Sequence, residues 1–176
     1  MPRRTTEPVD EEITFSADEI IVSKTDLQGR ILYANDVFCR VAEMSTKDVI
    51  GKPHNIIRHP DMPRAIFKLL WDTLTQQKEI FAYVKNMSTT GKYYWVIAHV
   101  TPTLDHTGAT SGYHSNRRVP GKKGIDAVVP LYAKLLAEEK RHSDHRQALA
   151  AGSAMLSNFL KETGKPYDEF IWSIGD

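Results

Sequence analysis

The run Tyr93-Tyr-Trp-Val-Ile-Ala-His-Val100, near the middle of the chain, decides the fold class. Its aromatic and β-branched residues favour a β-strand, in which successive side chains point to opposite faces of the sheet. One face carries Tyr94, Val96, Ala98 and Val100, and the other carries Tyr93, Trp95, Ile97 and His99. Both faces are fairly apolar, so we expect one face to line a core and the other to be covered by a helix or by another subunit.

Two more β-rich runs flank this strand. Ile80–Asn86 precedes it and Thr110–Val119 follows it. The connections Ser88-Thr-Thr-Gly91 and Asp105-His-Thr-Gly108 each contain the glycine that hairpin turns commonly need. The pattern predicts a meander of three antiparallel strands, whose middle member spans about Lys92–Thr101.

The region before this meander begins with a hairpin. Ile20–Thr25 and Arg30–Ala34 are short β-rich runs, and the turn between them ends in Gly29. Asn35 follows directly, and its side chain can accept hydrogen bonds from the first amides of a helix. We therefore expect a short helix from Asn35 to about Glu43.

Two further helices are expected before the meander. Ser45–Ile50 predicts a brief helix that ends at Gly51 and Pro53. Between Pro63 and about Gln77 the apolar residues recur at steps of three and four, which is typical of an amphipathic helix. Proline suits the first position of a helix, so this helix is expected to begin near Pro63.

The organisation of the whole chain follows from changes in composition. We expect a loosely ordered N-terminal cap over 1–18, a main α+β domain over 19–120 and a helical extension over 121–176. In the extension, an amphipathic helix is predicted from about Ile125 to Leu136, with Pro130 as its start or a kink. A second helix is predicted over His145–Lys161, and Tyr167–Trp172 is expected to form a short aromatic tail.

The charge of the chain is nearly balanced. It has 23 Lys and Arg residues against 22 Asp and Glu residues, a formal net charge of +1, so no global field attracts nucleic acid or an anionic membrane.

No apolar run approaches the roughly 20 residues of a membrane-spanning helix, and no secretory signal is seen at the start. Cys39 is the single cysteine, which fits a reducing cytoplasm. We expect a cytoplasmic protein whose partners are small molecules or proteins.

Four motifs resemble one known family. They are Pro53-His-Asn-Ile-Ile-Arg-His-Pro-Asp-Met-Pro63, Leu70-Trp71, Val84-Lys-Asn86, and Tyr94-Trp-Val96 with Pro102. Over about residues 25–132 the chain resembles the N-terminal FAD-binding PAS domain of aerotaxis transducers. The resemblance implies an α+β PAS fold, a five-stranded antiparallel sheet with short helices over a ligand pocket. It also implies a noncovalently bound FAD whose redox state alters the outward face of the sheet.

The resemblance also implies which residues affect flavin binding or signalling. They are Asn35, Arg58, His59, Asp61, Trp71 and Asn86. The carboxamide of Asn86 is both donor and acceptor, which matches the pyrimidine edge of a flavin. Arg58 and His59 suit phosphate oxygens, and Asp61 is expected to orient Arg58 or to cap the helix after Pro63.

Ser115 and Arg117 complete the expected site of eight residues. Trp71 either stacks on the ligand or fills the core. Ser115 and Arg117 occupy alternate positions of the last strand and are expected to reach either the ring edge or the phosphates. Cys39 lacks the sequence context of the cysteine that forms a photoadduct in light-sensing relatives, so we expect no such adduct.

The resulting hypothesis is an FAD-binding redox or oxygen sensor that is not an enzyme, since nucleophile elbows, phosphate loops and paired catalytic carboxylates are missing from the sequence. The sequence shows no membrane anchor or receptor coiled coil, so we expect output to a separate chain such as a chemoreceptor in aerotaxis. The apolar outer face favours a homodimer. Two alternatives stay open: a PAS interaction or dimerisation module without flavin, and a haem-based gas sensor that uses His54 or His59 as axial ligand. No metal site is expected.

Overall fold

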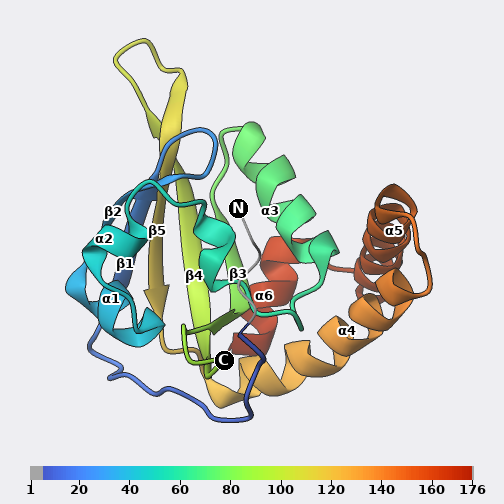
Figure 1. Ribbon diagram of the computed structural model, residues 1–176. Coiled ribbons are helices and arrows are strands. Elements are labelled where there is room, and N and C mark those ends of the chain that lie inside the picture. Colours follow the sequence, from blue (N-terminus) through green and yellow to red (C-terminus); the bar gives the residue numbers. More distant parts are fainter. Residues whose placement is uncertain (1–5, 176) are drawn as a thin grey trace.

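The computed structural model describes residues 6–175, which form one antiparallel sheet and a set of helices (Figure 1). The strands are β1 Ile21–Thr25, β2 Ile31–Ala34, β3 Ile80–Met87, β4 Tyr93–Leu104 and β5 Thr110–Arg118. The helices are α1 Asp36–Ala42, α2 Thr46–Val49, the 3-10 helix η1 His54–Ile57, α3 Arg64–Thr75, α4 Lys122–Lys140, α5 His145–Thr163 and α6 Tyr167–Gly175. The sheet has five strands in the order β2-β1-β5-β4-β3, which confirms the expected α+β fold.

Strand β4 forms the centre of the predicted meander. It pairs with β3 from Ile80 opposite Val100 to Met87 opposite Tyr93, and with β5 along its other edge. Burial alternates along its first eight residues, with the side chains of the Tyr94 face buried and those of the Tyr93 face partly exposed. The alternation read from the sequence therefore predicted which face of β4 lies on the core.

The second face of the sheet is covered, over β3 and β4, by helices of the same chain. Trp95 lies against Tyr132 of α4, with ring centroids 6.4 Å apart, and the hydroxyl of Tyr132 donates a 2.8 Å hydrogen bond to the carbonyl oxygen of Tyr83. Phe81 stacks on His99 and also contacts Trp172 of α6. Of the two covers expected for this face, a helix is the one present.

The two short helices before η1 begin where their capping residues predicted. The side-chain oxygen of Asn35 accepts hydrogen bonds from the amides of Phe38 (3.1 Å) and Val22 (3.0 Å). The side-chain nitrogen of Asn35, Nδ2, donates a 2.8 Å hydrogen bond to the carbonyl oxygen of Ile20. Ser45 and Asp48 form a reciprocal capping box at the start of α2. Asn35 thus fixes α1 to the first strand.

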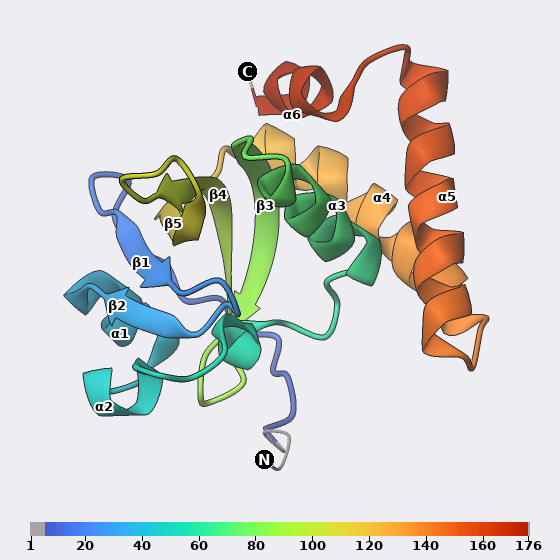
Figure 2. The same ribbon diagram turned by 90° about the horizontal axis from the view of Figure 1, so that it is seen from above.

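The helical extension is more regular than the sequence predicted. Helix α4 begins at Lys122, well before Pro130, which lies inside the helix. Residues expected to form an aromatic tail instead form α6, where Phe170 and Ile171 are buried. Phe170 packs edge-on against Phe159 of α5, with ring centroids 5.2 Å apart. Figure 2 shows α5 beside α3 and α4, at the opposite end of the molecule from α1 and α2.

The N-terminal segment is tied to the sheet rather than loosely attached. Glu12 forms a parallel bridge with Tyr93 at the start of β4. The amide of Ile13 donates to the carbonyl oxygen of Tyr93 at 2.7 Å, and the amide of Val9 donates to Gly91 at 2.9 Å. These backbone bonds leave no trace in side-chain patterns, so they could not be predicted from the sequence. Within residues 6–175, no helix is both long and apolar enough to cross a membrane.

Candidate functional site

A cavity of about 420 Å³ lies between the inner face of the sheet and the helices η1 and α3. Its walls come from every strand except β2, from the turn after β1, and from these two helices. The lining residues are Ser23, Thr25, Gln28, Gly29, Pro53, His54, Asn55, Ile57, Arg58, Phe67, Leu70, Trp71, Leu74, Val84, Asn86, Ala98, Val100, Tyr113, Ser115 and Arg117. About half of these side chains are apolar, and most of the polar ones lie on β1, β5 and η1.

Arg117 is the most deeply buried charged group of the cavity, whose other charged lining residue is Arg58. Arg117 lies on β5 and is only 2% exposed. Its Nε donates to the hydroxyl of Ser115 at 3.1 Å, and its Nη2 donates to the hydroxyl of Ser23. Burial lowers the pKa of Arg117 to about 10, so the guanidinium remains a cation at neutral pH. A buried cation of this kind requires nearby acceptors or an anionic or polar partner.

His54 on η1 completes this polar group. Its Nε2 lies 3.0 Å from the hydroxyl of Ser23 and 3.2 Å from Nη2 of Arg117. Burial, followed by the charge of Arg117, lowers the pKa of His54 to about 3, so the imidazole is neutral near pH 7. A guanidinium can only donate, so Nε2 is the acceptor in this contact and the ring proton belongs on Nδ1. Ser23, His54 and Arg117 therefore connect β1, η1 and β5.

Two buried polar atoms of the cavity have no hydrogen-bond partner among residues 6–175. They are Nη1 of Arg117 and Oγ1 of Thr25. Buried polar groups in folded proteins are almost always paired, so such atoms on a cavity wall indicate a bound molecule or water as their partner. A ligand with acceptor atoms along one edge fits this requirement.

The remaining walls suit a flat, largely apolar ligand. Asn86 on β3 is 4% exposed and lines the cavity on the same strand face as Val84. The Trp71 side chain on α3 is 39% exposed. Its ring packs edge-on against the ring of Tyr113, with centroids 5.2 Å apart. A Cβ added to Gly29 would lie 3.6 Å from the Trp71 ring, so the turn after β1 approaches this ring closely. Trp71 thus forms part of the wall rather than the centre of the core.

Arg58 lies at the edge of the cavity. Its Nη2 donates to the carbonyl oxygen of Met62 at 3.0 Å, and its guanidinium lies 4.2 Å from the centre of the Phe67 ring. Its backbone forms an antiparallel bridge with Asn86. Burial, and next the charge of Arg64, lower the pKa of Arg58. Arg58 also lines a second hollow outside the cavity.

Three residues expected at the site lie outside the cavity. Asn35 is engaged with the backbone of β1 and α1, as described above. His59 is 3% exposed, and its Nδ1 accepts a hydrogen bond from the amide of Asp61 at 3.1 Å. The carboxylate of Asp61 pairs with Nζ of Lys85 at 3.0 Å instead of orienting Arg58 or capping α3. His59 and Asp61 thus brace the loop that carries Arg58.

Five polar residues of the cavity were not among the site residues expected from the sequence: Ser23, Thr25, Gln28, His54 and Asn55. Ser23 and Thr25 were not proposed, and His54 was considered only as a haem ligand. The alternation along β1 places Ser23 and Thr25 on the same face as buried Ile21, and that signal was available in the sequence. The contact between His54 and Arg117 joins residues 63 positions apart, so no local pattern predicts it.

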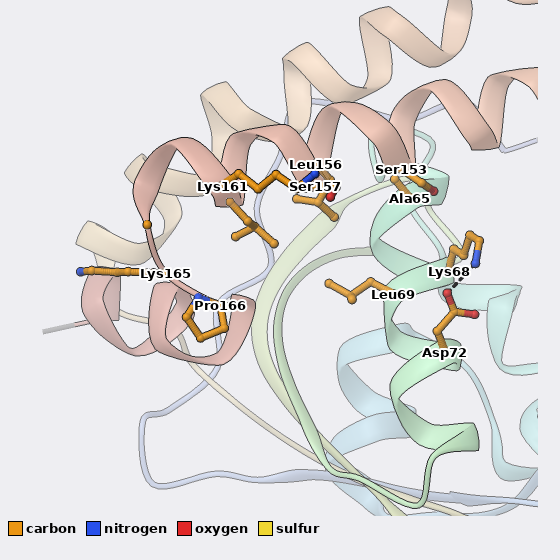
Figure 3. A pocket seen from close by; sticks show the side chains of 12 residues that line it. Ala65, Lys68, Leu69, Asp72, Ser153, Leu156, Ser157, Lys161, Lys165 and Pro166 are labelled. Carbon is orange, nitrogen blue, oxygen red and sulfur yellow. Dashed lines mark hydrogen bonds and ion pairs between the residues drawn. The ribbon is translucent and has the colours of Figure 1, made fainter.

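Another hollow, of about 480 Å³, lies between α3 and α5 (Figure 3). It contains none of the residues expected at the site, and its Lys68 and Asp72 pair with each other. Cys39 on α1 lies away from the cavity, near Thr46. Among residues 6–175, no three His, Cys, Asp or Glu side chains are placed to hold a metal ion.

Comparison with known proteins agrees with this geometry. A family model described as the PAS fold matches residues 31–116. The chain contains a PAS domain. It is 40% identical over 129 residues to the aerotaxis receptor of Escherichia coli (strain K12), an alignment that covers 73% of this chain and 25% of that receptor. The chain thus spans about a quarter of the length of this relative.

Solved structures show the same fold. A PAS domain from Colwellia psychrerythraea superposes with a TM-score of 0.53 at 20% identity, covering 57% of this chain and 85% of the other. A light-oxygen-voltage domain studied with a flavin analogue superposes with a TM-score of 0.53 at 14% identity, covering 71% of this chain and 87% of the other. The PAS fold is therefore supported by sequence and by architecture.

Proposed function

We propose that this PAS domain binds a flavin, FAD, in the cavity and reports redox or oxygen status to a partner protein. The observation that carries the proposal is the pair of buried atoms without a partner among residues 6–175, Nη1 of Arg117 and Oγ1 of Thr25, on the wall of a cavity that also has a large apolar surface. Flavin sites need apolar walls for the ring and a few placed polar groups for its edge. The similarity to the aerotaxis receptor supports a role in aerotaxis signalling.

The residues of the cavity fit a flavin in a specific way. Leu70, Val84 and Val100 supply apolar surface for the flat ring. The carboxamide of Asn86 offers a donor and an acceptor to a pyrimidine edge, and Arg117 offers a free N–H to an acceptor. When bound, a flavin supplies a redox couple in which N5 changes from acceptor to donor on reduction. The guanidinium of Arg117 can only donate hydrogen bonds. Its contact with the flavin is therefore the one most sensitive to a change of N5 from acceptor to donor.

A change at Arg117 reaches several elements together, because its partners Ser23, Ser115 and His54 lie on β1, β5 and η1. One hydrogen bond contributes about 0.5–1.5 kcal/mol, whereas shifting a two-state element from mostly off to mostly on needs about 5.5 kcal/mol. A group of linked contacts is therefore required. The output passes to α4 and α6 on the outer face, and from there to a separate chain such as a chemoreceptor in aerotaxis. We also propose a homodimer, formed through the part of the outer sheet face that the helices over β3 and β4 leave uncovered.

Two other functions compete with this one. A PAS module for interaction or dimerisation would have no flavin, and a haem-based gas sensor would need a histidine ligand in the cavity. His54 is the histidine there, but its Nε2 already contacts Ser23 and lies beside the cation of Arg117. The close position of that cation disfavours an iron ion at the same nitrogen.

The visible spectrum of the purified protein separates these functions. The proposal predicts flavin absorption, either as isolated or after addition of FAD and removal of excess. A Soret band would identify a haem protein. A colourless protein whose stability does not respond to FAD would support the interaction module, because a true ligand at a hundred times its dissociation constant adds about 2.7 kcal/mol to the free energy of unfolding.

A further inference from the structure

A larger, open hollow of about 950 Å³ adjoins the cavity, and we name it the basic trough. Pro53, Asn55 and Arg58 line both spaces, so the two hollows share part of their walls. The opposite wall of the trough is not part of the PAS sheet. It comes from the end of α4 and the start of α5, including Lys140, His142 and His145. The helical extension therefore lines a hollow that shares part of its wall with the cavity.

The basic trough carries an excess of positive charge. Lys52, Arg58, Arg64 and Lys140 line it, whereas its carboxylates are Glu7 and Glu139. The carboxylate of Glu139 is already committed, because it accepts hydrogen bonds from the amides of Arg64 and Ala65 at 2.9 Å each. Burial, and next the charge of Arg64, lower the pKa of Arg58, so two like charges lie close together on this wall. Such crowding is relieved by a bound anion.

The size of the cavity gives an independent argument. Its volume of about 420 Å³ lies near the lower end of the range for small-molecule sites, roughly 300–1,000 Å³. It suits an isoalloxazine ring with its ribityl chain, and the rest of a dinucleotide must lie elsewhere. The basic trough offers cations for a diphosphate, together with apolar surface for an adenine from Ile56, Met87 and Leu136.

We propose that the basic trough holds the diphosphate and adenosine of FAD, with Arg58 at the boundary and Lys140 of α4 as a phosphate contact. This inference rests on the proposed function and extends it. A ligand in this position touches both the PAS core and the α4–α5 turn. Dinucleotide binding then fixes the helical extension against the core, whereas a flavin without the adenosine diphosphate part occupies the cavity alone.

The test compares FAD with riboflavin on the same apoprotein. Wild-type protein should bind FAD at least tenfold more tightly than riboflavin, with FAD affinity falling as salt is raised. The variant Lys140→Glu should weaken FAD binding by about tenfold or more and leave riboflavin binding unchanged, because an ionic hydrogen bond is replaced by repulsion. Lys134→Glu is the matched control, since Lys134 is an exposed residue of α4 outside the trough.

Hydrogen exchange supplies a second readout, which does not depend on affinity. FAD, but not riboflavin, should slow amide exchange over residues 138–146 at the α4–α5 turn. If neither flavin binds, the proposed function itself fails. If both bind equally well, or if Lys140→Glu behaves like Lys134→Glu and the turn is not protected, a flavin occupies the cavity but the assignment of the trough is wrong.

Discussion

The carboxylate of Glu139 caps the start of α3 from a different helix, accepting a 2.9 Å hydrogen bond from the amide of Ala65. It accepts a second one, also 2.9 Å, from the amide of Arg64. The residue at the usual capping position, Pro63, provides no side-chain hydrogen bond. Since Glu139 belongs to α4 and is 5% exposed, the helical extension supplies a structural element that the PAS core lacks. An acidic group also suits the positive end of a helix.

Loss of this cap should destabilise the protein. Glu139→Ala leaves two buried amides without an acceptor, so the free energy of unfolding should fall by about 2 kcal/mol. Glu139→Gln keeps one acceptor oxygen and should lose less. Urea denaturation followed by circular dichroism measures both. Glu138→Ala, at the neighbouring position and paired with Arg141, is the control and should leave the midpoint unchanged; a Glu139→Ala midpoint equal to that of wild type would contradict the capping role.

The packing of α4 on the sheet depends on a glycine. A Cβ added at Gly124 would lie 2.1 Å from the hydroxyl oxygen of Tyr83 and 2.3 Å from the adjacent ring carbon. Tyr83 is 3% exposed and cannot move aside without displacing its neighbours. Gly124→Ala should therefore destabilise the protein by about 1–3 kcal/mol, although alanine favours a helix more than glycine does. Thermal unfolding beside the exposed control Lys122→Ala measures the effect, and a Gly124→Ala protein of raised stability would refute it.

Stability should fall as the solution becomes acidic. Burial, and then Arg117, lower the pKa of His54 to about 3 from its ordinary value of 6.5, so the unfolded chain binds a proton that the folded chain rejects. Stability from this residue is complete above about pH 6.5 and is lost as the pH falls toward 3, by about 5 kcal/mol if the whole shift is expressed. His54→Gln should lose less stability between pH 7 and pH 4.5 than wild type does. His106→Gln, in an exposed turn, should follow the wild-type profile.

Much of the fold follows from local sequence, and the reason is physical. Alternation along β3, β4 and β5 predicted that Asn86, Ser115 and Arg117 face inward, because the period of a strand fixes the side-chain direction. Helix starts at Asn35 and Ser45 followed from short-range capping. These features depend on neighbours within a few residues.

Features that depend on distant partners were not predictable. Helix α6 forms because Phe170 packs on Phe159, and a segment of nine residues has little helical stability of its own. Asp61 pairs with Lys85 because the loop before α3 runs beside β3, a register that is absent from any local pattern. The position of His54 beside Arg117 is of the same kind.

The central claim is tested most directly by titrating FAD into the apoprotein and comparing Arg117→Met with Arg118→Met. Arg118 is exposed on the opposite face of the same strand, so the two variants lose the same charge. Thr25→Val removes the other unpartnered atom, Oγ1 of Thr25. It provides a second test of the site if Arg117→Met does not fold. The account predicts one FAD per wild-type chain, about tenfold or greater weakening in Arg117→Met, a smaller loss in Thr25→Val and none in Arg118→Met. A wild-type protein that binds no flavin, or folded Arg117→Met and Thr25→Val proteins that bind FAD as wild type does, would contradict it.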